Sequence, residues 1–176
     1  SDMKKLRKRV SETIKQGNNL MLINSNTAVK EESFITVCDL LVTFSKQLGK
    51  NAAVLSSLIY TPDRDLQDNV TSFITENIFV EEDDAHHDDE EDDSAKIEML
   101  HKRRNLLACF CKLIVFNIIE MKAAASVFKH YMKYYNDYGD IIKMTLAKSR
   151  EINKVDCART LGLSLTQVHQ FSNCSI

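Results

Sequence analysis

Residues that interrupt helices are scarce along this chain, and this scarcity is the strongest constraint on its fold. The sequence contains one proline and four glycines among 176 residues. Both residue types break regular helices, and both are common in the turns that β-rich folds require. A chain with so few of them favours long helices over a turn-rich β architecture. We therefore expect an all-α fold.

Apolar residues that recur every three or four positions show where we expect the helices. Between residues 27 and 48, Cys38 and Leu41 belong to such a stripe. A threonine, a proline and an aspartate at residues 61–63 form a start signal for the next helix. The predicted helices cover residues 3–16, 27–48, 63–78, 95–119, 121–135, 139–152 and 154–170.

Glycines and polar residues mark the predicted helix ends. Gly17, followed by two asparagines, is expected to end the first helix. A polar turn is expected at residues 136–140, where Asp140 would cap the helix that follows.

The predicted helices group into hairpins. Residues 27–48 pair with 63–78, residues 95–119 with 121–135, and residues 139–152 with 154–170. A repeat of roughly 40 residues is typical of HEAT and armadillo proteins, although self-similarity between these pairs is weak. The second half of the 95–119 helix is apolar almost all round, which predicts a middle layer of a stack. We interpret residues 1–176 as a single α-solenoid segment of stacked HEAT-like hairpins.

Charge is distributed unevenly along the chain. The net charge is −2, yet residues 81–93 hold ten acidic residues and no Lys or Arg. Setting these ten aside from the 25 acidic residues leaves 15, against 23 Lys and Arg. Like charges at this density repel one another and cannot form a core. We predict a disordered acidic loop at residues 81–94 attached to a basic folded part.

Patterns that support catalysis or cofactor binding are not evident in the sequence. It has no glycine-rich phosphate loop, no nucleophile elbow and no zinc-ligand spacing. His86 and His87 lie within the acidic run, where we interpret them as solvated. An odd number of cysteines, five, indicates a reducing compartment. No apolar run is long enough for a membrane span. We expect no enzyme activity, cofactor, metal, membrane association or small-molecule substrate.

One motif offers an alternative reading as a DNA-binding helix-turn-helix. At residues 158–170, Ala158, Gly162 and Val168 have the spacing with which such motifs make their turn and pack their two helices. Thr166, Gln167 and Gln170 would then face bases. The competing interpretation is a core helix with one glycine in it.

The central part of the chain resembles a known family. The sequence HKRRNLL begins at residue 101, FKHYMKYYNDYGDIIK begins at residue 128 and KVDCARTL begins at residue 154. With the acidic loop upstream, these stretches resemble the stromal-antigen (SA or STAG) subunits of cohesin over most of the chain. The resemblance implies a segment of the later HEAT-repeat solenoid. It also implies a non-enzymatic scaffold that binds the kleisin subunit, contacts DNA in sister-chromatid cohesion, and acts in the nucleus on chromosomes.

Basic residues around this stretch are the predicted contacts to DNA. Contact through phosphates would be non-specific in sequence and sensitive to salt. The predicted phosphate-contacting residues are Lys102, Arg103, Arg104, Lys129 and Lys133. Four tyrosines cannot all be buried on one helix face and its turn, so we expect Tyr134 or Tyr138 to lie in a partner groove, with core packing as the alternative. The predicted partner-binding residues are Tyr134, Asp137 and Tyr138.

The resemblance weakens near the end of the chain. From Gly162 onward the sequence departs from the apolar helix of the family. The chain is therefore interpreted as an excised fragment, a truncated paralogue or an alternative C-terminus. A truncated paralogue could lack partner affinity. Its last helix would expose apolar surface and tend to associate.

Overall fold

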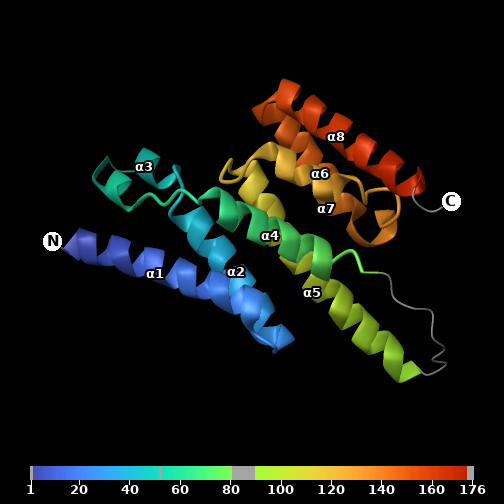
Figure 1. The fold of residues 1–176 in the computed structure, drawn as a ribbon, viewed down its shortest axis with the longest axis horizontal. Coiled ribbons are helices and arrows are strands. Elements are labelled where there is room, and N and C mark those ends of the chain that lie inside the picture. The colour runs from blue at the N-terminus through green and yellow to red at the C-terminus, as the bar shows by residue number, and fades with distance from the viewer. Residues whose placement is uncertain (1, 52, 81–89, 174–176) are drawn as a thin grey trace.

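Helices make up the regular structure of the chain. The computed structural model describes residues 2–51, 53–80 and 90–173, and this part contains no β-strand. The predicted all-α class is confirmed. Of the predicted disordered loop, residues 81–89 lie outside the described residues, whereas residues 90–94 belong to a helix. Figure 1 shows the helices stacked side by side across an elongated molecule.

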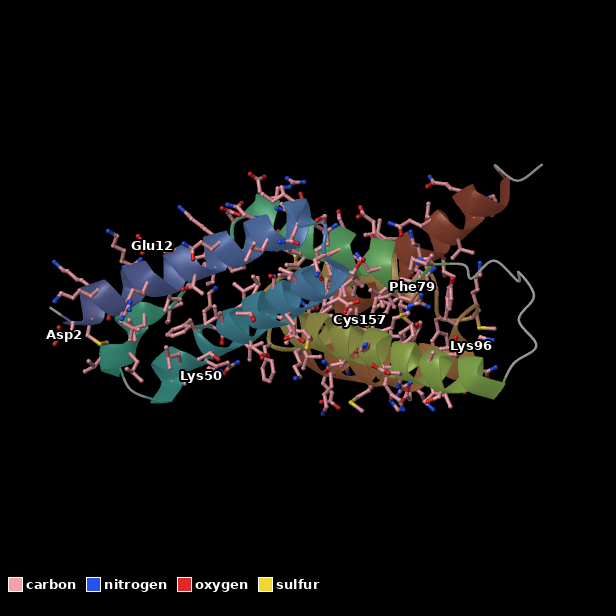
Figure 2. All side chains as sticks on the ribbon, turned by 90° about the horizontal axis from the view of Figure 1, so that it is seen from below. Asp2, Glu12, Lys50, Phe79, Lys96 and Cys157 are labelled. Atoms are coloured by element: carbon pink, nitrogen blue, oxygen red, sulfur yellow. The ribbon has the colours of Figure 1, made fainter. Side chains whose placement is uncertain are left out.

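The first two helices form an antiparallel pair at the N-terminal end of the stack. They are α1 (Asp2–Ile23) and α2 (Thr27–Thr43). The prediction that Gly17 ends the first helix is wrong, because α1 continues for six residues beyond it. A Cβ atom on Gly17 would lie 2.7 Å from Cγ2 of Val37, so this glycine permits close packing of α1 on α2. Figure 2 shows α1 along one edge of the molecule.

The chain between α2 and α4 is less regular than predicted. Helix α2 ends at Thr43 and not at residue 48, and short α3 (Leu48–Asn51) and η1 (Ala53–Leu58) follow. Helix α4 (Arg64–Asn77) begins where the sequence indicated. Asp63 is its N-cap, and its carboxylate accepts a hydrogen bond from the backbone N–H of Leu66 at 2.9 Å. The predicted pairing is also revised, since α2 pairs with α1 and α4 packs largely on α5.

Helix α5 (Glu90–Val115) is followed by the largest departure from prediction. It ends four residues before residue 119, and Asn117, with a φ of 53°, reverses the chain. The predicted helix 121–135 is instead η2 (Met121–Ala124), α6 (Ala125–Phe128) and a series of turns.

Helix α7 (Tyr135–Ile152) begins where a turn was predicted. Residues 136–140 are helical, and Asp140 lies inside α7 and does not cap it. Tyr138 and Ile142 are buried on one face of this helix. Packing of that face therefore overrides the local turn preference of the sequence.

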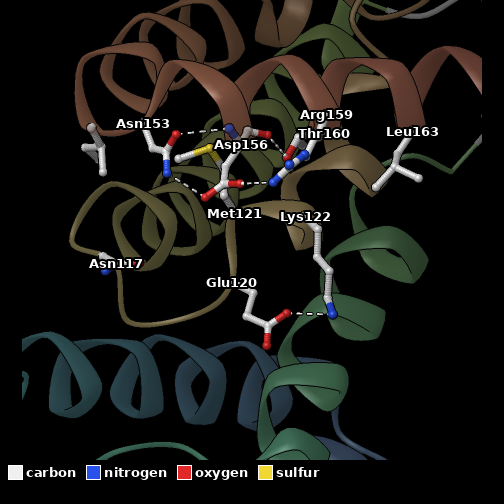
Figure 3. A pocket seen from close by; sticks show the side chains of 10 residues that line it. Asn117, Glu120, Met121, Lys122, Asn153, Asp156, Arg159, Thr160 and Leu163 are labelled. Atoms are coloured by element: carbon white, nitrogen blue, oxygen red, sulfur yellow. Dashed lines mark hydrogen bonds and ion pairs between the residues drawn. The ribbon is translucent and has the colours of Figure 1, made fainter.

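Helix α8 (Lys154–Asn173) completes the described structure. Asn153 precedes it, and its side-chain oxygen accepts hydrogen bonds from the N–H groups of Val155 and Asp156 at 3.0 and 3.1 Å (Figure 3). The helix passes unbroken through Gly162, so the helix-turn-helix alternative at residues 158–170 is wrong. Leu165 is 70% exposed, one of several apolar side chains that α8 presents to solvent.

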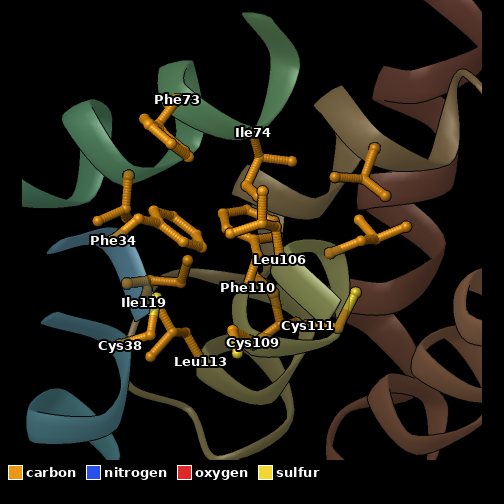
Figure 4. Close-up of a cluster of buried hydrophobic side chains, with 14 of the residues drawn as sticks. Phe34, Cys38, Phe73, Ile74, Leu106, Cys109, Phe110, Cys111, Leu113 and Ile119 are labelled. Carbon is orange, nitrogen blue, oxygen red and sulfur yellow. The ribbon is translucent and has the colours of Figure 1, made fainter. Parts of the chain in front are cut away.

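The hydrophobic core is centred on α5. This helix packs against α2, α4 and α7, which confirms its predicted place in the middle of the stack. Leu107, Phe110 and Leu113 on α5 have no exposed surface. Figure 4 shows Phe110 and Leu113 in the same cluster as Phe34 and Phe73. The rings of Phe34 and Phe73 stack with their centroids 4.6 Å apart. The start of α5 extends past its neighbours, and Ile97 is 57% exposed there although it belongs to the apolar stripe of this helix.

A candidate interaction groove between α5 and α7

Helices α5 and α7 bring together residues that are far apart in the sequence. Helix α5 carries Lys102, Arg103 and Arg104, and the chain that enters α7 carries Lys133 and Tyr134. The two helices pack directly on each other. Most of the predicted site residues therefore lie in one region of the surface.

A groove of about 480 Å³ occupies this region, and we call it the α5–α7 groove. It contains all three predicted partner residues, together with Arg103 and Lys133 from the predicted phosphate contacts. Lys102, Arg104 and Lys129 do not line it. The lining residues are Val80, Lys96, Leu100, Arg103, Lys133, Tyr134, Asp137 and Tyr138.

Stacked aromatic rings support the floor of the groove. The ring of Phe79 stacks on that of His130 with centroids 4.0 Å apart, and Tyr138 meets Phe79 edge-on at 5.9 Å. Tyr138 is 2% exposed. It therefore packs in the core and at the same time lines the groove, which were the two alternatives predicted for it. Burial lowers the pKa of His130 to about 4, and the positive charges of Lys129 and Lys133 add to this effect. His130 is therefore neutral near pH 7.

The tyrosines and the basic side chains of the groove contact one another. Burial raises the pKa of Tyr138, while the charge of Arg103 and a hydrogen bond from it act in the opposite direction. The Nζ atom of Lys133 lies 5.6 Å from the ring centroid of Tyr134, a cation–π geometry. The basic groups are thus positioned by the aromatic floor.

Arg104 holds the start of α7 against α5 from beside the groove. Its Nη1 and Nη2 atoms donate hydrogen bonds to Oδ1 and Oδ2 of Asp140, at 3.0 and 2.5 Å, and Nη1 also donates to the backbone carbonyl of Asp137. The hydrogen bond from Arg104 lowers the pKa of Asp140. The guanidinium of Arg104 is 30% exposed, and we interpret it mainly as a support for the groove.

The other predicted phosphate contacts lie outside the groove lining. Lys102 projects from α5 and its Nζ atom lies 2.8 Å from the carboxylate of Glu98 one turn earlier. The side chain of Lys102 is 57% exposed. Lys129 is half-buried beside His130.

Three groove residues were not found by sequence reasoning. Lys96 lies two turns and Leu100 one turn before Arg103 on α5, so all three share one face of that helix. That spacing was a signal that could have identified the α5 wall. Val80 gave no such signal, because it reaches the groove through the path of the chain after α4.

A second cavity lies where η2 faces the start of α8 (Figure 3). Its volume is about 640 Å³. Two ion pairs line it, one between Glu120 and Lys122 at 2.6 Å and one between Asp156 and Arg159 at 3.2 Å. It contains none of the predicted site residues.

Metal and membrane sites are also absent from the described part of the chain. Residues 2–51, 53–80 and 90–173 hold no group of three or more His, Cys, Asp or Glu side chains arranged to bind a metal ion. Within the same residues, no helix combines the length and apolarity needed to span a bilayer. The described cysteines are all buried free thiols.

The fold and the groove define an all-α segment of stacked helices with a concave, basic and aromatic surface between α5 and α7. Comparison with known proteins makes the relationship specific, although no family model matches the chain. Cohesin subunit SA-1 of Xenopus laevis is 50% identical over 153 residues, and cohesin subunit SA-3 of Homo sapiens is 43% identical over 151 residues. Cohesin subunit scc-3 of Caenorhabditis elegans is 32% identical over 154 residues. The chain belongs to the SA family of cohesin subunits.

These alignments cover most of this chain and a small part of each relative. They include 84% of the chain for the SA-1 and SA-3 proteins and 88% for scc-3. The chain spans 12% of the length of the first two and 14% of the third.

Proposed function

We propose that this chain is a non-enzymatic scaffold module of cohesin, which binds the kleisin subunit and contacts DNA during sister-chromatid cohesion in the nucleus. The α5–α7 groove is the observation that carries this proposal. It combines a concave surface, the half-buried ring of Tyr134 above the buried ring of Tyr138, and basic side chains on a helical support. The family membership supplies the cohesin context.

Kleisin binding rests on the chemistry of the groove lining. Tyrosine and arginine are the residue types that contribute most often to the strongest contacts of protein interfaces. Tyr134 and Arg103 lie in this groove beside Tyr138. Arg103 lies on α5, and Tyr134 and Tyr138 lie at the start of α7, so a partner would bind side chains that helices already hold in place.

DNA contact rests on the basic surface around the groove. Lys102, with its side chain in solvent, Arg104 and Lys129 lie outside the groove lining and are the proposed phosphate contacts. Arg103 and Lys133, also predicted from the sequence as phosphate contacts, line the groove that we assign to the kleisin subunit. Such contacts carry no base information, and each one adds to the dependence of affinity on salt.

A pull-down with overlapping fragments of the kleisin subunit tests the partner role. We expect the full chain to retain one fragment, and Tyr134→Ala to weaken that retention at least severalfold. Tyr135→Ala is the matched control, because the neighbouring ring is 55% exposed and lies outside the groove. Retention of no kleisin fragment by the unaltered chain would instead support a segment without partner affinity.

Titration of labelled duplex DNA at several salt concentrations tests the DNA role. We expect affinity to fall steeply as salt rises, and the double variant Lys102→Gln/Lys129→Gln to reduce the slope of this dependence by about two. An affinity that does not change with salt would contradict phosphate contact.

A further inference from the structure

We infer that the α5–α7 groove takes an extended acidic peptide that inserts one apolar side chain, and that it is not a docking site for duplex DNA. This inference rests on the proposed partner-binding function and specifies the chemistry of the partner at that site. The sequence predicted partner binding and DNA contact on the same surface, and the inference assigns the groove to the partner alone.

The shape of the groove favours a peptide. Leu100 and Val80 give it an apolar wall, and Tyr138 closes the floor. A volume of about 480 Å³ is in the range of pockets that hold one or a few side chains. Burying an apolar side chain against this wall is favourable, whereas a phosphate gains nothing from it.

The charge of the groove selects acidic residues on either side of that apolar side chain. Lys96 and Arg103 lie on the α5 wall and Lys133 lies on the opposite wall, and among the described lining residues Asp137 alone is acidic. Because cations stand on both walls, carboxylates before and after the inserted side chain both meet positive charge. Such complementarity selects partners more than it adds raw affinity.

The supports of the groove lower the cost of binding. The stack of His130 on Phe79 lies below it, and Arg104 fixes the first turn of α7 through Asp140. A partner therefore orders its own chain without having to order the site.

A second basic face of the molecule lies on α1, away from the groove. Lys4, Lys8 and Lys15 on α1 are exposed and share one face of that helix, since they are spaced by four and seven residues. This face lies at the edge of the molecule, where Figure 2 shows the side chains of α1 projecting outward. Its shallow hollow is lined by charged and polar side chains, among them Glu12, whose carboxylate lies 3.6 Å from Nζ of Lys8. It provides the comparison for the groove, because it offers positive charge without an apolar wall.

The test uses the full chain and synthetic fluorescent peptides in an anisotropy titration. The probe is a short peptide with one phenylalanine flanked on both sides by glutamates. We expect it to bind, and we expect both a Phe-to-Ser peptide and a Glu-to-Gln peptide to bind at least about fivefold more weakly. Equal binding of either altered peptide would overturn the inference.

Paired variants locate the binding. Arg103→Gln/Lys133→Gln removes two charges from the groove, and Lys4→Gln/Lys8→Gln removes two from α1. We expect the first variant to weaken peptide binding about fivefold or more and the second to weaken it by less than about twofold. Circular dichroism confirms that each variant is folded. An effect of the α1 variant equal to that of the groove variant would overturn the inference.

Competition with duplex DNA tests whether the groove binds phosphates instead of a peptide. If DNA displaces the peptide competitively, and the groove variant lowers DNA affinity more than the α1 variant does, the groove is a phosphate site and the inference is wrong. Failure of the peptide to bind while a kleisin fragment is still retained would refute the inference and leave the proposed function standing. Failure of the unaltered chain to retain any kleisin fragment would count against the proposed function itself.

Discussion

Arg104 on α5 binds both carboxylate oxygens of Asp140 on α7, although the two residues are 36 positions apart in the chain. The same guanidinium also donates to the backbone carbonyl of Asp137, so it holds two residues three positions apart in the first turns of α7. Bidentate pairs of this kind are the stronger class of charged hydrogen bond. This contact joins the two helices that form the walls of the groove.

A double-mutant cycle on Arg104 and Asp140 should give a favourable coupling of about 1 kcal/mol in urea unfolding. The expected value is modest because the side chain of Asp140 is 65% exposed. The control cycle uses Lys148 and Glu151, a pair within α7 whose Nζ to Oε2 distance is 2.9 Å. That pair should couple by about 0.3 kcal/mol, and equal couplings in the two cycles would contradict a special role for Arg104.

Protonation of His130 should destabilise the protein between about pH 6.5 and pH 4. Its pKa falls from an ordinary 6.5 to about 4 on folding, so in this interval the unfolded chain binds a proton that the folded chain does not. The contribution of neutral His130 is complete above pH 6.5 and is lost as the pH falls toward 4. Urea midpoints measured from pH 7 to pH 5 should therefore decrease.

The variant His130→Phe separates this effect from the titration of carboxylates. Phenylalanine keeps an aromatic ring against Phe79 but cannot ionise. We expect its urea midpoint to decrease less than that of the unaltered protein between pH 7 and pH 5. Identical pH profiles would show that His130 does not carry the effect.

Two glycines should respond in opposite directions to alanine. Gly17→Ala should cost about 1–3 kcal/mol, because the added methyl group would lie 2.7 Å from Val37. Gly162→Ala should stabilise the protein by about 0.5–1 kcal/mol, because a Cβ atom there meets no other atom within 4 Å and alanine favours helix. Thermal unfolding of both variants checks this contrast, and a change of the same sign in both would contradict it.

Substitution of Thr166 and Gln167 by alanine should leave any preference of the chain for DNA sequence unchanged. Both residues lie within the unbroken helix α8, which has no turn at Gly162 to present a recognition helix. Competition between labelled and unlabelled duplexes of different sequence measures the preference. A preference in the unaltered chain that disappears in the variant would restore a base-reading role for these residues.

The order of helices followed from the sequence where local signals and packing agree. Asp63 predicted the start of α4 correctly, and the apolar surface of α5 predicted its central position. The two wrong predictions, a helix end in α1 and a turn at the start of α7, both result from contacts between elements that are distant in the sequence. The local sequence around Gly17 predicts a helix end, but α1 continues because Gly17 packs against Val37. Residues 136–140 predict a turn, but they are helical because Tyr138 is buried. Local preference is a weak guide where tertiary burial competes with it.

The groove could be predicted in part. Arg103, Tyr134 and Tyr138 stood out as residue types suited to interfaces, and the structure places all three in one concavity. Its shape could not be predicted, because it depends on how α7 sits on α5, and residues 129–134 form turns instead of the expected helix. The hydrogen bonds from Arg104 to Asp140 could not be predicted either, because they also depend on how α7 packs on α5.

The central place of α5 has a mechanical consequence. It contacts α2 and α4 on the N-terminal side and α7 on the C-terminal side. A force that draws the two ends of the segment apart therefore passes through this helix and loads its buried faces in shear. Close-packed interiors resist such sliding until they yield together. The stiffness of this part of the solenoid depends largely on α5, because α4 and α6 make the smaller direct contact between the two sides. A core mutation such as Phe110→Ala would therefore soften the segment.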